Sequence, residues 1–194
     1  MLAQVKTFCL VGIEAFLVDV EVDVSAAAQP STQLVGLPEA AVRESTPRLA
    51  RAIVNSGYER PNDRVVINLA PAELPKQAAS FDLPMSMGML AASGQYISER
   101  FSEYAVVGEL SLEGRTRPVR GALSMAIAAA QDSNLRGLLV PSENAAEAAV
   151  VEEIDVIPVD SLSQAIGFFT GTVDITPTPS GIQELFANFA QYDI

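Results

Sequence analysis

The chain has 194 residues, of which 49% are hydrophobic and 19% are charged, so it is able to bury the core of one sizeable domain. Its formal net charge is −12, and this excess of acids repels nucleic-acid phosphates and disfavours tight nucleic-acid binding by the chain alone. With no histidine and one cysteine, the sequence excludes histidine-dependent catalytic triads, histidine or thiolate zinc sites and an internal disulfide.

No apolar run reaches the roughly 18 residues that a membrane span needs. The short apolar patch at residues 8–11 has no basic leader before it, so a secretory signal is not indicated. We therefore expect a cytoplasmic protein that contacts no membrane, in which Cys9 is a small buried hydrophobic residue.

The first two predicted strands cover residues 5–10 and 15–24. In the second strand, valines at every even position from 18 to 24 alternate with Asp19, Glu21 and Asp23. This period of two is typical of a strand with one buried face and one face in water. The three acids would also suit a metal cluster, but carboxylates two residues apart are what a solvated strand face produces, and we favour that interpretation.

A short strand at residues 33–35 precedes a helix that we expect to begin at Pro38 and to be interrupted near Pro47, with Thr46 as N-cap. This segment carries Arg43, Arg48 and Arg51. Guanidinium groups bind carboxylates and phosphates in bidentate fashion, so the three arginines would contact a phosphate or a partner subunit. The alternative, which we favour, is a solvated face with salt bridges to nearby acids.

A strand at residues 64–70 is followed by a methionine-rich helix at residues 83–92, with Asp82 as its expected cap. Ser86 lies on this helix and Lys76 ten residues earlier, so these two are the candidates for a serine–lysine peptidase dyad. A buried hydroxyl without a close base usually bonds the preceding turn of its own helix. Ser86 is therefore only a weak catalytic candidate.

Residues 104–111 and 116–119 are predicted strands joined by a turn at Glu113 and Gly114, and a helix follows at residues 121–130. Arg115, Arg117 and Arg120 alternate along this hairpin and its exit. They are the first candidates for a contact with DNA or a protein partner, and pairing with intramolecular acids is the alternative.

Strands at residues 136–140 and 155–159 alternate with a short helix that runs to residue 150 and a helix that runs from the cap Ser161 to residue 169. Residues 171–181 have the proline- and threonine-rich composition of a linker, and we expect the chain to be cut rather than finished at its end. Neither lysine follows a glycine as in GxxxxGK[ST], and no GxGxxG opens a helix after a strand. We therefore expect no cofactor site in this chain.

Five blocks of the sequence resemble the amino-terminal domain of the ComM/YifB family of magnesium-chelatase-like AAA+ proteins. They are VGLPEAAVRES (35–45), VINLAPAELPK (66–76), FDLPMSMGMLAASGQ (81–95), GELSLEGRTRPVRGAL (108–123) and VPSENAAEAAVV (140–151). The resemblance implies an amino-terminal domain at residues 1–171 and a linker at residues 172–194 toward an AAA+ module.

The resemblance also implies an α+β fold similar to the proteolytic domain of Lon (ribosomal S5 domain 2-like), with helices packed on a mixed sheet. It implies a parent protein that binds ATP and Mg²⁺ in its AAA+ module, assembles as a hexamer and acts as a DNA helicase in branch migration during natural transformation. Within that parent, this chain would be a non-catalytic domain that aids ring assembly or guides DNA, and it would bind DNA weakly at most by itself.

Lon carries its serine in a DGPSAG-like turn, and by resemblance Met85 takes the place of that serine while Ser86 falls one position late, about 100° around the helix. Lon's lysine follows a Pro-x-Gly-Gly pattern, whereas residues 118–121 lead here to Leu123 and Ser124, neither of which is a base. The resemblance thus implies that the peptidase dyad is missing. A Lon-like serine peptidase and a module that recruits a protein partner are the alternative functions.

Overall fold

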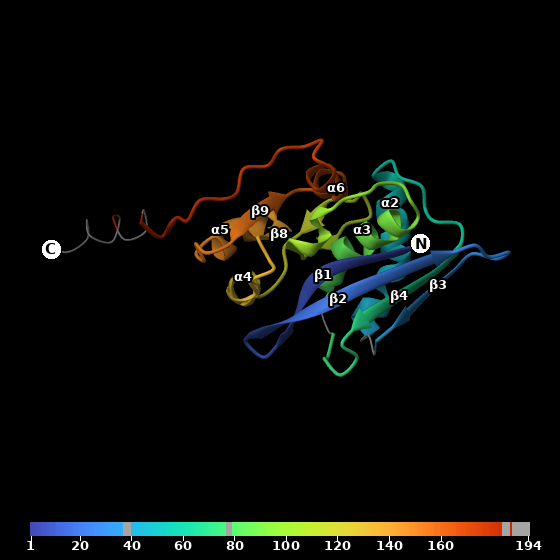
Figure 1. Ribbon diagram of the computed structural model, residues 1–194, viewed down its shortest axis with the longest axis horizontal. Coiled ribbons are helices and arrows are strands. Elements are labelled where there is room, and N and C mark those ends of the chain that lie inside the picture. The colour runs from blue at the N-terminus through green and yellow to red at the C-terminus, as the bar shows by residue number, and fades with distance from the viewer. Residues whose placement is uncertain (37–39, 77–78, 184–186, 188–194) are drawn as a thin grey trace.

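The computed structural model describes residues 1–36, 40–76, 79–183 and 187. These residues form a seven-stranded mixed sheet in the order β3-β4-β2-β1-β5-β8-β9 (Figure 1). The antiparallel part consists of β1 (Leu2–Val11), β2 (Glu14–Ser25) and β4 (Arg64–Ala70), and β3 (Ser31–Val35) lies parallel to β4. On the other side of β1, the parallel strands are β5 (Tyr104–Val106), β8 (Gly137–Pro141) and β9 (Asp155–Val159). The mixed sheet expected from the sequence is confirmed.

The alternation predicted for β2 is confirmed. Val18, Val20 and Val22 are completely buried on the face that meets α3 (Asp82–Ala92), whereas the acids between them lie half-buried on the opposite face. On that second face, Asn68 of the neighbouring strand β4 donates a hydrogen bond of 2.7 Å to Glu21. Cys9 is buried, as expected, and desolvation raises the pKa of its thiol.

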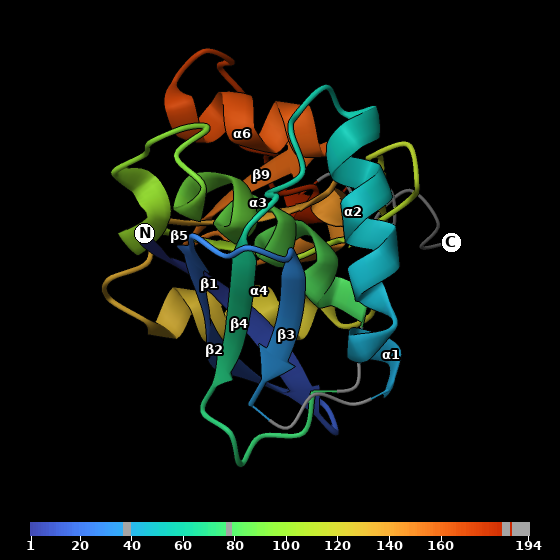
Figure 2. The same cartoon turned by 90° about the vertical axis from the view of Figure 1, so that its right-hand side faces the viewer.

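Helices cover the two faces of the sheet (Figure 2). The helices on one face are α2 (Ser45–Asn55), α3 and α6 (Leu162–Thr170), and those on the other are α4 (Ala122–Gln131) and α5 (Ala145–Ala148). The remaining short helices are α1 (Ala40–Arg43), η1 (Ala79–Phe81), η2 (Arg100–Ser102) and η3 (Ser142–Asn144). Because both faces are covered at β8, every residue of that strand is buried, which explains its continuous apolar sequence.

The central helix α3 is buried on all sides. Gly88 lets it lie close to the sheet, because a Cβ at this position would come within 2.7 Å of Cγ2 of Val22. The methionine-rich sequence of α3 therefore fills the core, as predicted.

Two helix starts differ from those expected. The interruption near Pro47 is confirmed, but α2 begins at Ser45 after Glu44, so Thr46 is not the N-cap, and no side chain caps this end among the described residues. Asp82 is the first residue of α3 rather than its cap, because its carboxylate binds other partners. The expected start at Pro38 lies outside the described residues.

The single strand expected at residues 104–111 is divided into β5 and β6 (Glu109–Leu110). Gly108 leaves the main sheet because its N–H donates to the carbonyl of Ser80 and its own carbonyl accepts from the N–H of Leu83, both at 2.9 Å. β6 then pairs with β7 (Thr116–Arg117) in a separate two-stranded sheet, and β7 is shorter than expected. The two hydrogen bonds of Gly108 thus connect the β6–β7 hairpin to the start of α3.

The chain leaves α6 along the outer side of β9 (Figure 1). Ser161 caps α6 as predicted, since its Oγ accepts from the N–H of Gln164 at 3.1 Å. Beyond α6, the N–H of Thr178 donates to the carbonyl of Val156 at 2.8 Å. Of the expected linker at residues 172–194, positions 184–186 and 188–194 lie outside the described residues, and within the described part no helix is long and apolar enough to cross a membrane.

Candidate functional site

Arg48 joins α2 to the start of α3. Its Nε donates to Oδ2 of Asp82 at 2.6 Å and its Nη2 to Oδ1 at 3.1 Å, which makes a bidentate pair with a fully buried carboxylate. Oδ2 also accepts from the N–H of Leu110 at 3.1 Å. The hydrogen bond to Asp82 raises the pKa of the Arg48 guanidinium further above neutrality. Arg48 thus forms an intramolecular salt bridge. For the group of Arg43, Arg48 and Arg51, salt bridges to acids of the same chain were the alternative to contact with a phosphate or a partner subunit.

The β6–β7 hairpin is fixed on two sides. On one side, Nδ2 of Asn55 at the end of α2 donates to the carbonyl of Leu112 at 2.6 Å. On the other side, Oγ1 of Thr116 donates to the carbonyl of Val159 in β9 at 2.7 Å. The hairpin is therefore a rigid support for the arginines that it carries.

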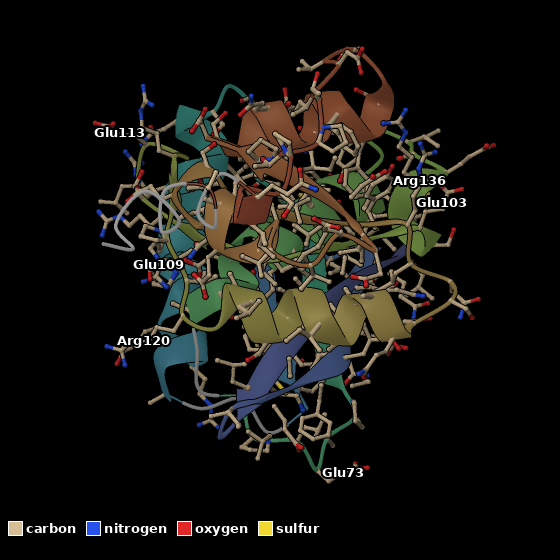
Figure 3. The ribbon with its side chains drawn as sticks, turned by 90° about the vertical axis from the view of Figure 1, so that its left-hand side faces the viewer. Glu73, Glu103, Glu109, Glu113, Arg120 and Arg136 are labelled. Atoms are coloured by element: carbon tan, nitrogen blue, oxygen red, sulfur yellow. The ribbon has the colours of Figure 1, made fainter. Side chains whose placement is uncertain are left out.

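Five exposed arginines lie on elements that adjoin one another, and we call them the arginine edge: Arg43, Arg51, Arg115, Arg117 and Arg120. The elements are α1, α2, which contacts β6, and the hairpin with the loop that leads into α4. In Figure 3, Arg120 projects outward on the side that also carries Glu109 and Glu113.

The charge of the arginine edge is only partly compensated. Nη1 of Arg117 lies 4.0 Å from Oε1 of Glu109, and because these side chains are 61% and 31% exposed, the pair contributes about 0–1 kcal/mol. The described acids on these elements are Glu44, Glu109 and Glu113, against five exposed arginines. On these elements the arginines therefore outnumber the acids, on a chain whose formal net charge is −12. Glu147 of α5 adjoins the same region, where its Oε1 accepts from the N–H of Leu123.

The serine and lysine considered as a dyad are not joined by any hydrogen bond among the described residues. Ser86 is completely buried, and its Oγ has no partner in this part of the chain. Lys76 is also buried, and its Nζ donates to the carbonyls of Gly36, at 3.0 Å, and Pro71. Burial lowers the pKa of Lys76, while Cys9 and Glu73 act in the opposite direction. Lys76 therefore links two loops, and within the described part of the chain no base is hydrogen-bonded to Ser86.

The position that the Lon comparison assigns to the serine is occupied by Met85, which is completely buried in the core. Leu123 and Ser124, at the position of the lysine, lie in the first turn of α4. Within the described residues no group of three or more histidine, cysteine, aspartate or glutamate side chains could hold a metal ion.

Sequence comparison gives the family. The chain matches the family model described as subunit ChlI of Mg-chelatase over residues 20–144, and it belongs to this family.

Curated relatives agree with this assignment and with the resemblance inferred from the five blocks. The chain is 40% identical over 170 residues to YifB, an uncharacterized protein of Salmonella typhimurium, with 88% of the chain and 33% of YifB covered. It is 36% identical over 189 residues to the competence protein ComM of Haemophilus influenzae, with 97% of the chain and 36% of ComM covered. The chain thus spans about a third of the length of the curated relatives that it matches.

Proposed function

We propose that the chain is a non-catalytic amino-terminal domain of a longer magnesium-chelatase-like AAA+ ATPase, with the Lon-like fold that the resemblance implies. In this role its arginine edge contacts DNA or a neighbouring subunit when the longer protein assembles as a ring. The observation that carries the proposal is the gathering of five exposed arginines on adjoining, well-anchored elements of an otherwise acidic chain.

The surroundings of the former peptidase positions support a non-catalytic role. A nucleophile needs an accessible hydroxyl and a base within hydrogen-bond reach. Ser86 is buried in the middle of α3, and the amine of Lys76 is engaged by two backbone carbonyls. Lys76 thus holds the loops around the core, and Ser86 is enclosed in the core with no hydrogen-bond partner for its hydroxyl among the described residues.

The activity of the parent belongs to the part of the protein outside this chain. We propose that this remaining part binds ATP and Mg²⁺, forms a hexamer in the cytoplasm and drives DNA branch migration. The name of the relative ComM, a competence protein, supports a role in natural transformation.

The test uses the longer protein with three charge reversals, Arg115→Glu, Arg117→Glu and Arg120→Glu. We expect the rate of branch migration of a four-way DNA junction to fall at least about tenfold while ATP hydrolysis without DNA is retained. Mass photometry in the presence of ATP reports whether the ring still assembles, which separates a DNA contact from a subunit contact.

A matched control is Arg136→Glu, because Arg136 is also exposed but lies on the opposite side of the molecule (Figure 3). Normal branch migration and normal ring assembly in the triple variant would overturn the role of the arginine edge. Casein cleavage that is lost on Ser86→Ala would overturn the non-catalytic role.

A further inference from the structure

The main sheet opens between β1 and β5. Their pairing includes only Lys6 and Ala105, and β5 ends one residue later at Val106 while β1 continues along β2 to Val11. From these two carboxyl ends the chain leaves in opposite directions, toward β2 on one side and toward the hairpin, α4 and β8 on the other. In open α/β sheets, a crevice at such a switch point is the preferred place for a ligand.

A cavity of about 500 Å³ lies at this opening, within the size range of ligand sites. Its walls come from the end of β1, from η1, from β6 and from the loop before α4. The residues that matter for binding are Leu10, Ala79, Ser80, Glu109 and Arg120.

The edge of β1 presents backbone groups to this cavity. Met1 and Val24 exchange two backbone hydrogen bonds, so in the register of β1 with β2 the odd-numbered residues of β1 bond to β2. The N–H and C=O of Leu10 therefore point away from β2, four residues beyond the pairing of Lys6 with β5. An extended chain placed beside Leu10 would continue the sheet.

A hydroxyl group on the opposite wall has no partner. Ser80 is only 2% exposed, and its Oγ makes no hydrogen bond among the described residues. Leaving a buried polar group unpaired costs about 1–3 kcal/mol, and a ligand that bonds this hydroxyl recovers that free energy. Ser80 lines the cavity, so a rotation of its side chain would bring this hydroxyl within reach of a bound ligand.

The charge at the cavity is suited to an acidic group. Arg120 is exposed and has no ion-pair partner among the described residues, whereas Glu109 lies 4.0 Å from the guanidinium of Arg117. The carboxylate in the wall is therefore partly compensated, and the guanidinium at the mouth is available.

We propose that this cavity binds an extended peptide segment of a partner protein. The segment adds to the open edge of β1 through the backbone of Leu10, bonds the hydroxyl of Ser80 and places an acidic side chain at Arg120. This binding goes beyond the proposed contact with DNA or a neighbouring subunit and includes no cleavage.

The test screens the 194-residue chain against an immobilised array of random ten-residue peptides, in parallel with the variant Ala79→Phe, which fills the cavity. We expect the wild-type chain to select peptides with a conserved acidic residue and the Ala79→Phe variant to lose at least about 90% of the signal. Thermal unfolding of the variant shows whether it is folded, and Ser80→Ala, which removes only the hydroxyl, is the second variant if it is not.

The selected peptides are then measured in solution by fluorescence anisotropy. Methylation of alternate backbone nitrogens should weaken binding at least about tenfold, because it removes the donors of a sheet ladder. Arg120→Glu should weaken binding of the acidic peptide to a similar extent, whereas Arg136→Glu should leave it unchanged. Equal selection by the wild-type chain and both cavity variants, or indifference to backbone methylation, would overturn the proposal.

The Ala79→Phe comparison is independent of the proposed role in DNA branch migration. Ala79→Phe changes no charge, so the arginine edge remains intact in that variant. Loss of peptide binding in Ala79→Phe would support the peptide site whatever the arginine variants do in branch migration. Normal branch migration and ring assembly in the triple arginine variant would overturn only the role of the arginine edge.

Discussion

At the scale of single residues, the pair of Arg48 and Asp82 should have the largest effect on stability. Removal of one partner leaves the other charge buried, and we expect Arg48→Ala to lower the free energy of unfolding by about 3 kcal/mol. Urea unfolding followed by circular dichroism measures this. Arg51→Ala is the control, because Arg51 is exposed on the same helix, and its effect should stay within about 0.5 kcal/mol. Equal losses in the two variants would contradict the assignment.

Tyr96 should make stability depend on pH in the alkaline range. Its buried hydroxyl donates to the carbonyl of Met87 at 2.9 Å, and burial raises its pKa well above the ordinary value. The unfolded chain therefore loses this proton first as the pH rises above about 10, so the contribution to stability is complete below that pH and is lost above it.

We expect Tyr96→Phe to flatten this alkaline loss by up to about 1.4 kcal/mol per pH unit, measured by urea unfolding between about pH 9 and 11. Burial also raises the pKa of Tyr104, so some slope should remain in the variant. An unchanged slope in Tyr96→Phe would show that Tyr96 ionises equally well in the folded protein.

At the scale of elements, the contact between α2 and the hairpin can be tested with glycine. Gly114 and Gly57 both have positive φ, +81° and +86°, so alanine is strained at either position. Only at Gly114 would the added Cβ overlap a neighbour, the Oγ of Ser56, and also approach the carbonyl of Ala52 to 3.1 Å. We expect Gly114→Ala to lower the melting temperature several degrees more than Gly57→Ala, and equal shifts would mean that the contact adapts freely.

The predictions that succeeded from sequence rest on neighbours along the chain. The alternation of β2 and the cap at Ser161 depend on residues two or three positions apart. The wrong cap at Asp82 depends on distant partners, because its carboxylate binds Arg48, 34 residues away, and the N–H of Leu110, 28 residues away. No local pattern contains that information, and the break in the strand at Gly108 has the same cause.

The candidate site shows the same limit. Sequence named the arginines of both groups, but nothing in it placed α2 beside the hairpin, a contact that spans 57 residues between Asn55 and Leu112. The unpaired hydroxyl of Ser80 also required the structure, since its burial depends on how η1 packs against α1, α3 and β6. One sequence signal for the contact between α2 and α3 was available, because Arg48 and Asp82 carry opposite charges and lie in or at the start of two predicted helices.

At the scale of the whole molecule, the formal net charge of −12 repels DNA and opposes the attraction of DNA to the arginine edge. We expect the chain alone to bind a four-way DNA junction with a dissociation constant above about 1 µM at about 50 mM salt, and to lose binding by about 200 mM. The triple arginine reversal should abolish binding at the lower salt. Fluorescence anisotropy measures both, and a salt-resistant, sub-micromolar complex would mean that the chain is itself a primary DNA-binding domain.

The two outer strands of the sheet differ in what lies beside them. The carbonyl of Val156 in β9 already accepts a hydrogen bond from Thr178, whereas β3 is the last strand at the other end, with Val35 44% exposed. A sheet with two open borders can recruit one copy after another and grow into a fibre. With the carbonyl of Val156 engaged by Thr178, the border at β9 offers one acceptor fewer to a strand of a second copy. The hydrogen bond of Thr178 therefore makes β9 a poorer border than β3 for accidental strand pairing.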